Sequence, residues 1–244
     1  MSEPTTVVST DKDALAAEVS RRLVDLVEDV QAAGGIPSVV LTGGTIADVL
    51  HRRVAQDSAS TGVAWADVDL WWGDERWLRM GDPERNEQQA RDAFLDAVGA
   101  DGRVRAVAYD DGVITVEQAA DAYAAELAAA SDDGVSPVFD VVMLGVGDDG
   151  HVASLFPHHP GLDVTGVAVT AVFDSPKPPP TRVSMTFETL NKARHVWFLV
   201  SGEGKAAAVA RALAGDDVAG TPANGVRGTE STTWFLDPGS ASQL

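Results

Sequence analysis

A carboxylate and a histidine, Asp149 and His151, stand two residues apart in a glycine-rich stretch of the chain. The stretch spans residues 140–157 and opens with the apolar run Val-Val-Met-Leu, which is typical of a strand buried on both faces. The glycines that follow let the backbone turn sharply beside a ligand, because they have no Cβ. A histidine that a carboxylate orients can act as a general base. The stretch alone also allows a plain glycine-rich turn with a solvated histidine.

Four further polar clusters each follow a predicted strand. They are Thr42-Gly43-Gly44-Thr45, Asp74-Glu75-Arg76, the pair Lys177 and Arg182 in a proline-rich loop, and Lys205. Hydroxyl groups and free N–H groups at a helix start bind anions, and a lysine at such a start is favourable only if an anion offsets the helix dipole. Each cluster alone also allows a structural interpretation: a tight turn, an Asp–Arg pair that closes a turn, or a rigid surface linker with solvated cations.

The elements that must position these clusters alternate along the chain. Apolar runs predict strands at 5–8, 36–41, 68–72, 104–109, 141–144, 165–173, 196–200 and 232–236. Helical spacing follows Thr10 or Asp11 up to the Gly34-Gly35 pair, and recurs at 46–54, 83–98, 115–130 and 206–214. Residues 183–192 fit either a strand or a short helix. This alternation predicts an α/β protein with a mostly parallel, doubly wound sheet, and ligands bind at the carboxyl edge of such sheets.

The composition is that of a globular protein. The 244 residues are 45% hydrophobic and 23% charged, and none is cysteine, which excludes disulfides and a thiol nucleophile. No apolar run approaches the length of a membrane span, and residues 1–4 carry no sign of a signal peptide. We find no repeats or linkers. We therefore expect a single domain over residues 1–244 and a cytoplasmic location.

The formal net charge is −19, from 37 acidic and 18 basic residues. This charge argues against nucleic acid or an anionic membrane surface as a partner. It does not argue against a small anionic substrate, which responds to local charge. We expect a small-molecule substrate as the partner and a monomeric protein.

Taken together, these stretches resemble the glucosamine-6-phosphate isomerase/6-phosphogluconolactonase family. The sharpest matches are residues 145–157, 73–76 and 176–182, and the loops at 42–45 and 201–205 also match. The resemblance covers nearly the whole chain. It implies a Rossmann-like α/β fold with a mostly parallel sheet and helices on both faces.

The chain departs from the usual motifs of the lactonases at a few positions. Thr42 stands where serine is usual, Asp148 stands where glutamate is common before the aspartate, and the sequence around Asn86 is looser than the usual Ser-Asn pattern. The related amino-sugar phosphate deaminases differ more: they carry glutamate where this chain has Phe156, and tyrosine where it has Arg76. The resemblance therefore favours the lactonases over the deaminases. A catalytically idle sugar-phosphate sensor is the alternative from a different class.

The resemblance implies hydrolysis of 6-phospho-D-glucono-1,5-lactone in the oxidative pentose phosphate pathway. His151 would activate water, Asp149 would orient its imidazole, and Arg76 or Lys177 would stabilise the oxyanion. The residues that would bind the substrate and its phosphate are Thr42, Gly43, Gly44, Thr45, Lys177, Arg182 and Lys205. Neither a cofactor nor a metal is expected, because the adjacent His158 and His159 point apart and no carboxylates flank them.

Overall fold

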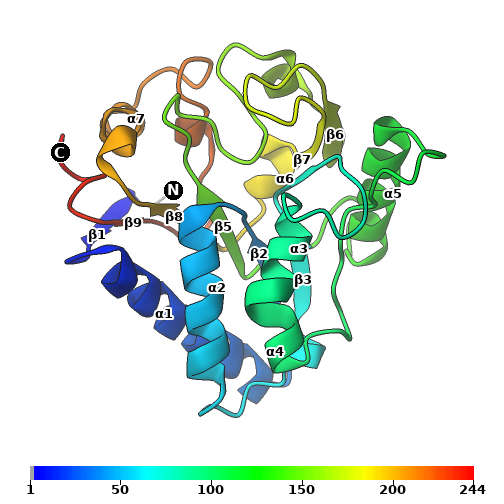
Figure 1. The fold of residues 1–244 in the computed structure, drawn as a ribbon, viewed down its shortest axis with the longest axis horizontal. Helices are drawn as coiled ribbons and strands as arrows, with labels where there is room; N and C mark the ends of the chain where they lie inside the picture. Colours follow the sequence, from blue (N-terminus) through cyan, green and yellow to red (C-terminus); the bar gives the residue numbers. More distant parts are fainter. Residues whose placement is uncertain (1–2) are drawn as a thin grey trace.

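Six parallel strands form the central sheet of the computed structural model, which describes residues 3–244. The expectation that residues 1–4 are not part of a signal peptide falls partly on Met1 and Ser2, which lie outside the described residues. The strands of the sheet, in spatial order, are β1 (Thr5–Val8), β9 (Ser231–Leu236), β8 (His195–Val200), β5 (Val141–Gly145), β2 (Ser38–Leu41) and β3 (Asp69–Trp72). This arrangement confirms the predicted parallel sheet (Figure 1).

Helices connect the strands and cover both faces of the sheet, as predicted. They are α1 (Lys12–Ala32), α2 (Thr45–Ser58), α3 (Asn86–Ala90), α4 (Asp96–Val98), α5 (Val116–Ala129), α6 (Phe187–Leu190) and α7 (Ala206–Leu213). A π-helical turn over Arg91–Leu95 joins α3 to α4, so the helix predicted over 83–98 is interrupted. Helices α1, α2, α3 and α4 lie together on one side of the sheet in Figure 1.

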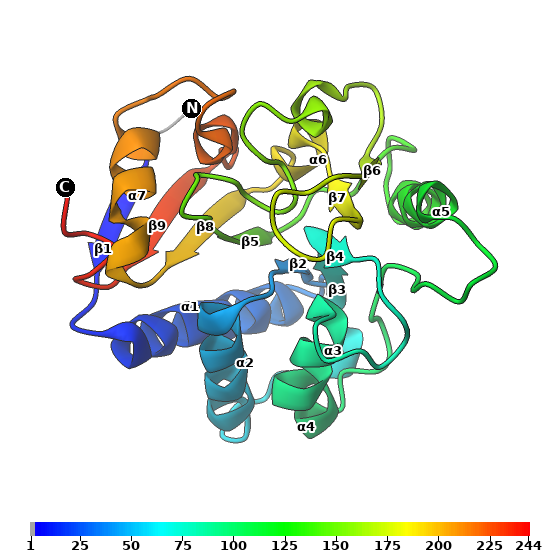
Figure 2. The ribbon, with the colours of Figure 1, turned by 45° about the horizontal axis from the view of Figure 1, so that its top comes forward.

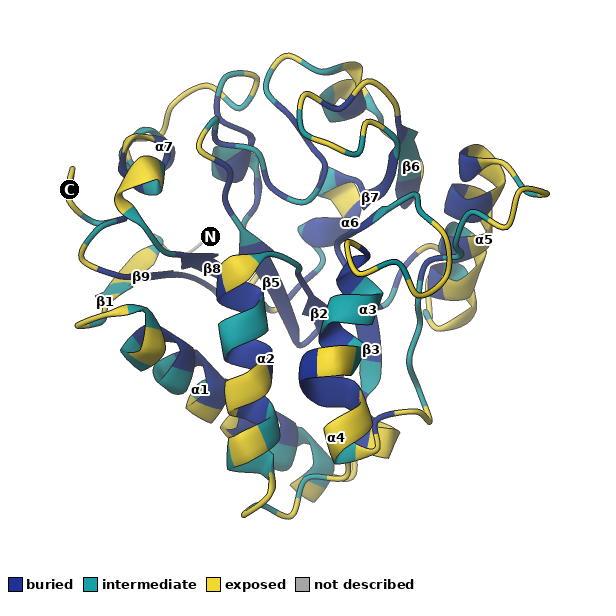
Figure 3. Ribbon diagram, viewed as in Figure 1, coloured by how far each residue is buried: buried dark blue, intermediate teal, exposed yellow. Residues whose placement is uncertain are grey.

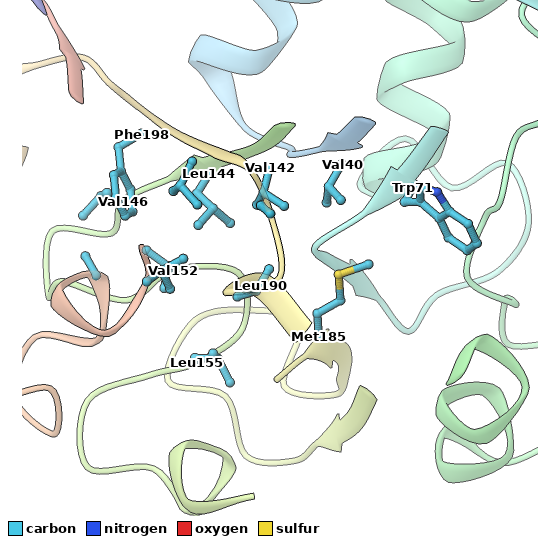
Figure 4. Close-up of a cluster of buried hydrophobic side chains, with 14 of the residues drawn as sticks. Val40, Trp71, Val142, Leu144, Val146, Val152, Leu155, Met185, Leu190 and Phe198 are labelled. Carbon is cyan, nitrogen blue, oxygen red and sulfur yellow. The ribbon is translucent and has the colours of Figure 1, made fainter. Parts of the chain in front are cut away.

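Neighbouring residues of each strand contribute to two different cores. Val39 and Leu41 of β2 pack against α1 and α2, whereas Val40 faces the core on the other side of the sheet. All four residues of β2 are buried, and the central strands are dark blue in Figure 3. Figure 4 shows the second core, where Val40, Val142 and other strand residues meet Leu155, Met185 and Leu190. Burial on both faces explains why the strands are continuous apolar runs rather than alternating ones.

A second, antiparallel sheet lies over one face of the first. Its strands, in spatial order, are β4 (Asp74–Arg76), β7 (Arg182–Met185) and β6 (Val169–Val172). The alternative interpretation of Asp74-Glu75-Arg76, an Asp–Arg pair that closes a turn, is therefore wrong. The strand predicted at 165–173 is shorter. The loop that carries Lys177 joins β6 to β7 and does not follow a strand of the central sheet.

The strand predicted at 104–109 is reduced to a single bridge between Val104 and Leu70. Beyond this bridge the backbone finds other partners: the carbonyl of Val107 accepts a hydrogen bond of 2.7 Å from the buried Arg85. A backbone group that a side chain satisfies has no need of a strand partner. The chain therefore leaves the edge of β3 after one residue pair.

Side-chain caps begin two of the helices where the sequence predicts them. The Asp11 carboxylate accepts a 2.8 Å hydrogen bond from the N–H of Ala14 and starts α1. Thr115 and Gln118 form a reciprocal capping box at α5. Such caps satisfy N–H groups that have no partner inside the helix. Among residues 3–244, no helix is long and apolar enough to cross a membrane.

The direction of winding changes between β2 and β5. From β2 the chain proceeds outward to β3, and it later returns to β5 on the opposite side of β2. The loops that follow these two strands diverge and leave a crevice at the carboxyl edge, which is where ligands bind in doubly wound sheets. The Thr42 hydroxyl accepts a 3.3 Å hydrogen bond from the N–H of Gly145. This bond connects the loop after β2 with the end of β5 at the start of the crevice.

One buried histidine predicts how the fold responds to acid. His51 of α2 is 2% exposed and stacks on Phe94, and neither of its ring nitrogens has a hydrogen-bond partner among residues 3–244. Burial lowers the pKa of His51 to about 4, against an opposing effect of Asp48. Below pH 6.5 the unfolded chain therefore takes up a proton that the folded chain excludes. The free energy of unfolding is expected to fall by about 3 kcal/mol between pH 6.5 and pH 4 from this group.

Urea unfolding of the wild type and of His51→Leu at pH 7 and pH 4.5 measures this effect. The wild type is expected to lose more stability than the variant over this interval. His158→Asn removes an exposed histidine and serves as the control. Equal losses in the wild type and in His51→Leu would contradict the prediction.

Candidate active site

A cavity of about 590 Å³ opens at the carboxyl edge of the central sheet, where the winding changes direction. It is lined by the loops that follow β2, β5 and β8, by β4, and by the loop between β6 and β7. All five polar clusters that the sequence singles out reach this cavity. Ten of their residues line it, namely Thr42, Gly43, Gly44, Thr45, Asp74, Arg76, His151, Lys177, Arg182 and Lys205.

Asp149 holds the imidazole of His151 in one orientation. Its Oδ1 lies 2.6 Å from Nδ1 of His151 and also accepts a 3.1 Å hydrogen bond from the His151 N–H. Burial alone would raise the pKa of Asp149, but the hydrogen bonds from His151 lower it to about 2. The carboxylate is therefore charged at neutral pH and binds the Nδ1 proton, which leaves Nε2 as the basic nitrogen.

The loop around this pair is built to hold it. A Cβ on Gly147 would lie 2.1 Å from Nδ1 of His151, so only glycine allows the pair to form. Phe156, fully buried, packs its ring 4.5 Å from the imidazole centroid. Arg211 of α7 donates a 3.2 Å hydrogen bond to the backbone carbonyl of Asp149 from behind. The imidazole is therefore fixed by contacts on its Nδ1 side and its ring face.

The loop after β2 presents a helix start to the cavity. Gly44 is the N-cap of α2, with φ at 98°, and no side chain caps this helix. The first N–H groups of α2 are therefore available to a ligand, and the helix dipole favours an anion there. With the Thr45 hydroxyl beside them, these groups have the donors that an anion needs, and the anion cradle that the sequence indicates stays a prediction.

Asn86 packs against this cradle. A Cβ on Gly43 would lie 1.9 Å from Oδ1 of Asn86, so the glycine is required for this close approach. The side chain of Asn86 donates a 2.9 Å hydrogen bond to the backbone carbonyl of Asp74. Asn86 is 97% buried and lines the cavity, and its side chain does not cap α3. The sequence left its role open between a cap and a substrate contact.

Two arginines lie opposite each other at the cavity wall. Arg76 of β4 and Arg182 of β7 are directly paired across the antiparallel strands, where like charges are destabilising. The buried Asp74 lies beside Arg182: its Oδ2 is 3.8 Å from Nη1 of Arg182 and accepts a 2.6 Å hydrogen bond from the Ser154 hydroxyl. Burial lowers the pKa of Arg182, against the opposing effect of Asp74.

The two guanidinium groups have different partners. Arg182 donates from Nε and Nη2 to three backbone carbonyls of the proline-rich loop, those of Lys177, Pro178 and Pro179. Arg76 donates 2.5 Å to the carbonyl of Glu84 from Nη1, while its buried Nε has no partner among residues 3–244. Arg182 thus holds the proline-rich loop in place, whereas the Nε of Arg76 has no hydrogen-bond partner among the described residues.

Glu75, the middle residue of the predicted cluster, points away from the cavity. It is 1% exposed, and it accepts hydrogen bonds from the backbone N–H groups of Arg76, Asn86 and Glu87 at 2.7 to 2.9 Å. Burial raises its pKa to about 7, although Arg85 and these N–H groups act in the opposite direction. Glu75 therefore caps α3 from β4 and fixes the backbone beside Arg76.

Two lysines complete the cavity wall. The Lys177 ammonium lies 2.8 Å from Asp148, and this contact lowers the pKa of Asp148 and raises that of Lys177. Lys205 is the N-cap of α7 and makes no hydrogen bond or ion pair through its ammonium within the described part of the chain. Both lysines are therefore at the cavity, as the sequence indicates.

Sequence reasoning missed Lys12, which lines the cavity. A signal was present, because Lys12 is a lysine at a helix start, like Lys205. Asp74 and Ser201 lie in stretches that the sequence singles out, but they were given no role of their own. The contacts of Asp74 with Ser154 and Arg182, which are far away in the sequence, place it at the cavity wall.

Residues 3–244 contain no cluster of three or more His, Cys, Asp and Glu side chains that could hold a metal. The ring of His159 is occupied by the backbone: Nε2 lies 2.7 Å from the Phe173 carbonyl and Nδ1 accepts from Gly161. Its neighbour His158 is exposed. The expectation of a reaction without metal or cofactor stays a prediction.

The fold and the site together define a doubly wound α/β protein whose cavity holds a histidine oriented by an aspartate and a helix start without a side-chain cap. The chain belongs to the family described as glucosamine-6-phosphate isomerases/6-phosphogluconolactonase, whose model matches residues 10–234. It is 49% identical to the 6-phosphogluconolactonase of Streptomyces coelicolor, over 99% of this chain and 95% of that protein. It is 42% identical to the 6-phosphogluconolactonase of Mycobacterium tuberculosis, over 96% of each.

A solved structure shows the same fold. The 6-phosphogluconolactonase of Trypanosoma brucei superposes with a TM-score of 0.87 over 99% of each chain, at 27% identity. The family resemblance that the sequence motifs indicate is therefore confirmed.

Proposed function

We infer that this chain hydrolyses 6-phospho-D-glucono-1,5-lactone to 6-phospho-D-gluconate, the lactone step of the oxidative pentose phosphate pathway. Relatives with 49% and 42% identity over nearly the full chain carry the name 6-phosphogluconolactonase. The observation that supports the chemistry best is the Asp149–His151 pair, with a 2.6 Å contact that leaves Nε2 of a cavity-lining imidazole as the basic nitrogen.

In the proposed mechanism, Nε2 of His151 takes a proton from a water molecule as the water oxygen attacks the lactone carbonyl carbon. The C–O double bond opens to a tetrahedral oxyanion. When the carbonyl re-forms, the bond to the ring oxygen breaks, and the imidazolium returns its proton to that oxygen. Asp149 stays ionised throughout and stabilises the imidazolium. The product is an open-chain acid, which releases its carboxyl proton to solvent at neutral pH.

Arg76 is the cation that we assign to the oxyanion. Arg76 lines the cavity and is paired with a second arginine across the strands β4 and β7. A positioned donor of this kind contributes about 3–4 kcal/mol to transition-state stabilisation. Lys177 is the second candidate, but its ammonium is already paired with Asp148 at 2.8 Å. The negative charge of the transition state would relieve the repulsion between the two arginines.

The phosphate is proposed to bind at the start of α2. Thr42, Gly43, Gly44 and Thr45 surround this start, and Lys205 supplies a positive charge. The sequence also indicates Arg182 for this charge. Because Arg182 donates to three loop carbonyls, we assign it instead to holding the loop of Lys177.

The alternatives receive less support. A deaminase of this family would need an acid–base group where this chain has Phe156, which is fully buried against His151. A catalytically idle sensor would not need the hydrogen-bonded Asp149–His151 pair. We also propose that the enzyme is monomeric. We propose a cytoplasmic location, because a doubly charged sugar phosphate does not cross a bilayer.

The direct test generates the lactone in place by enzymatic oxidation of glucose 6-phosphate and follows its disappearance against the spontaneous rate. The proposal requires strong acceleration by the wild type. Binding of 6-phosphogluconate without any acceleration would support the sensor instead. Release of ammonia from glucosamine 6-phosphate would support the deaminase.

Lys205→Met is expected to raise KM about 10–100-fold while kcat stays near its wild-type value. The reason is that a charged hydrogen bond to phosphate is made equally in the ground state and the transition state. Lys192→Met is a matched control, because Lys192 pairs with Asp133 outside the cavity. An unchanged KM in Lys205→Met would remove Lys205 from the phosphate site.

A further inference from the structure

Five cationic side chains line the cavity of a chain whose net charge is −19. They are Lys12, Arg76, Lys177, Arg182 and Lys205. Three of the four lysines of the whole sequence are thus at one site, and the fourth is Lys192. In so acidic a chain, this concentration of ammonium groups points to an anionic ligand.

Three of these cations already have partners within the protein. Lys177 lies 2.8 Å from Asp148, Arg182 donates to three loop carbonyls, and Arg76 donates to the carbonyl of Glu84. The ammonium groups of Lys12 and Lys205 make neither a hydrogen bond nor an ion pair with any of residues 3–244. Lys12 and Lys205 are therefore the two cations of the cavity whose terminal groups have no hydrogen-bond or ion-pair partner among residues 3–244.

Both lysines stand at helix starts, and at α1 the carboxylates of Asp11 and Asp13 already offset part of the dipole. Lys12 is the first residue of α1, a helix of 21 residues, and Lys205 is the N-cap of α7. A cation at a helix start opposes the helix dipole, which favours negative charge there. Figure 2 shows the first turns of α1, α2 and α7 close to one another, around the carboxyl ends of β2 and β8. The uncapped start of α2 and the ammonium groups of Lys12 and Lys205 thus lie at the same end of the cavity.

We propose that Lys12 is a second phosphate-binding residue, which neutralises the substrate phosphate together with Lys205. A phosphate monoester carries a charge of about −1.5 to −2 at pH 7, so a single lysine leaves it under-compensated. The Lys177–Asp148 pair, near His151, is neutral overall and faces the reacting lactone. Lys12 thereby contributes to selectivity for phosphorylated over unphosphorylated lactones. This inference rests on the proposed function.

Titration calorimetry with 6-phosphogluconate tests the role of Lys12. Lys12→Met is expected to weaken binding about tenfold and to leave kcat with saturating lactone unchanged. Lys12→Arg, which keeps the charge, is expected to restore most of the affinity, and Lys192→Met to bind like the wild type. The affinity for unphosphorylated gluconate is expected to be the same in all variants.

A second measurement separates a binding role from a structural one. Because Lys12 opposes the dipole of α1, Lys12→Met is expected to melt at the same temperature as the wild type or higher, in the absence of ligand. A residue retained for stability would show the opposite change.

Three outcomes overturn the inference. They are equal 6-phosphogluconate affinity of Lys12→Met and wild type, an equal loss of gluconate affinity, and a lower melting temperature that accounts for the weaker binding. Failure of the proposed function would look different from all of these outcomes: the wild type itself would not accelerate lactone hydrolysis.

Discussion

Replacing His151 by alanine is expected to lower kcat by a factor of about 10²–10⁴, which is the usual contribution of a positioned general base. The reason is that Nε2 of His151 is the basic nitrogen at the cavity, since Asp149 occupies Nδ1 at 2.6 Å. The substitution also removes the group that returns the proton to the ring oxygen. Both halves of the reaction therefore slow together.

Lactone loss at saturating substrate measures this effect, with the spontaneous rate subtracted. Binding of 6-phosphogluconate to His151→Ala is expected to match the wild type, because the phosphate cradle is formed by other loops. His158→Asn, in the same segment but exposed, is expected to retain full activity. Wild-type turnover in His151→Ala would move the base to another residue and leave the overall function intact.

Asp149→Asn is expected to cost nearly as much, about 10²–10⁴ in kcat. The hydrogen bonds from His151 lower the pKa of Asp149 to about 2, so its carboxylate is charged at every pH at which the protein works. An asparagine has the same shape but no charge, and its amide can donate to Nδ1 and select the wrong tautomer. The imidazolium that forms during attack then lacks its counter-charge.

A comparison of kcat with binding distinguishes orientation from a merely structural role. Because the pKa of Asp149 is lowered to about 2, its carboxylate is ionised throughout the working range, and Asp149→Asn is expected to lose kcat at every pH in that range. Binding of 6-phosphogluconate is expected to stay near the wild-type value, since Asp149 does not line the cavity. Wild-type kcat in Asp149→Asn would show that Asp149 does not act on His151.

Local patterns were enough to predict most of the central sheet. Strands buried on both faces are apolar at every position, so Val141–Gly145 and His195–Val200 are recognisable without knowledge of their neighbours. The glycine-rich loops that follow them are also local signals, because a backbone that approaches its own side chains closely requires glycine. The carboxyl edge as the site follows from the alternation of strands and helices.

The second sheet was not predictable in the same way. Its strands β4 and β7 are three and four residues long and lie far apart in the sequence, so neither has a pattern that reveals its partner. Asp74-Glu75-Arg76 therefore resembled a charged turn. Pairing with β7 decides that Asp74 and Arg76 face the cavity while Glu75 is buried.

The sequence by itself determined the family, the parallel sheet and the types of residue that carry the chemistry, because these depend on short stretches with their own physical signatures. Only the tertiary structure decided how each cation is used. Arg182 is occupied by loop carbonyls, Lys177 by Asp148, and Lys12 is free at the cavity. These differences arise from contacts between segments that the chain brings together only on folding, and no local pattern encodes them.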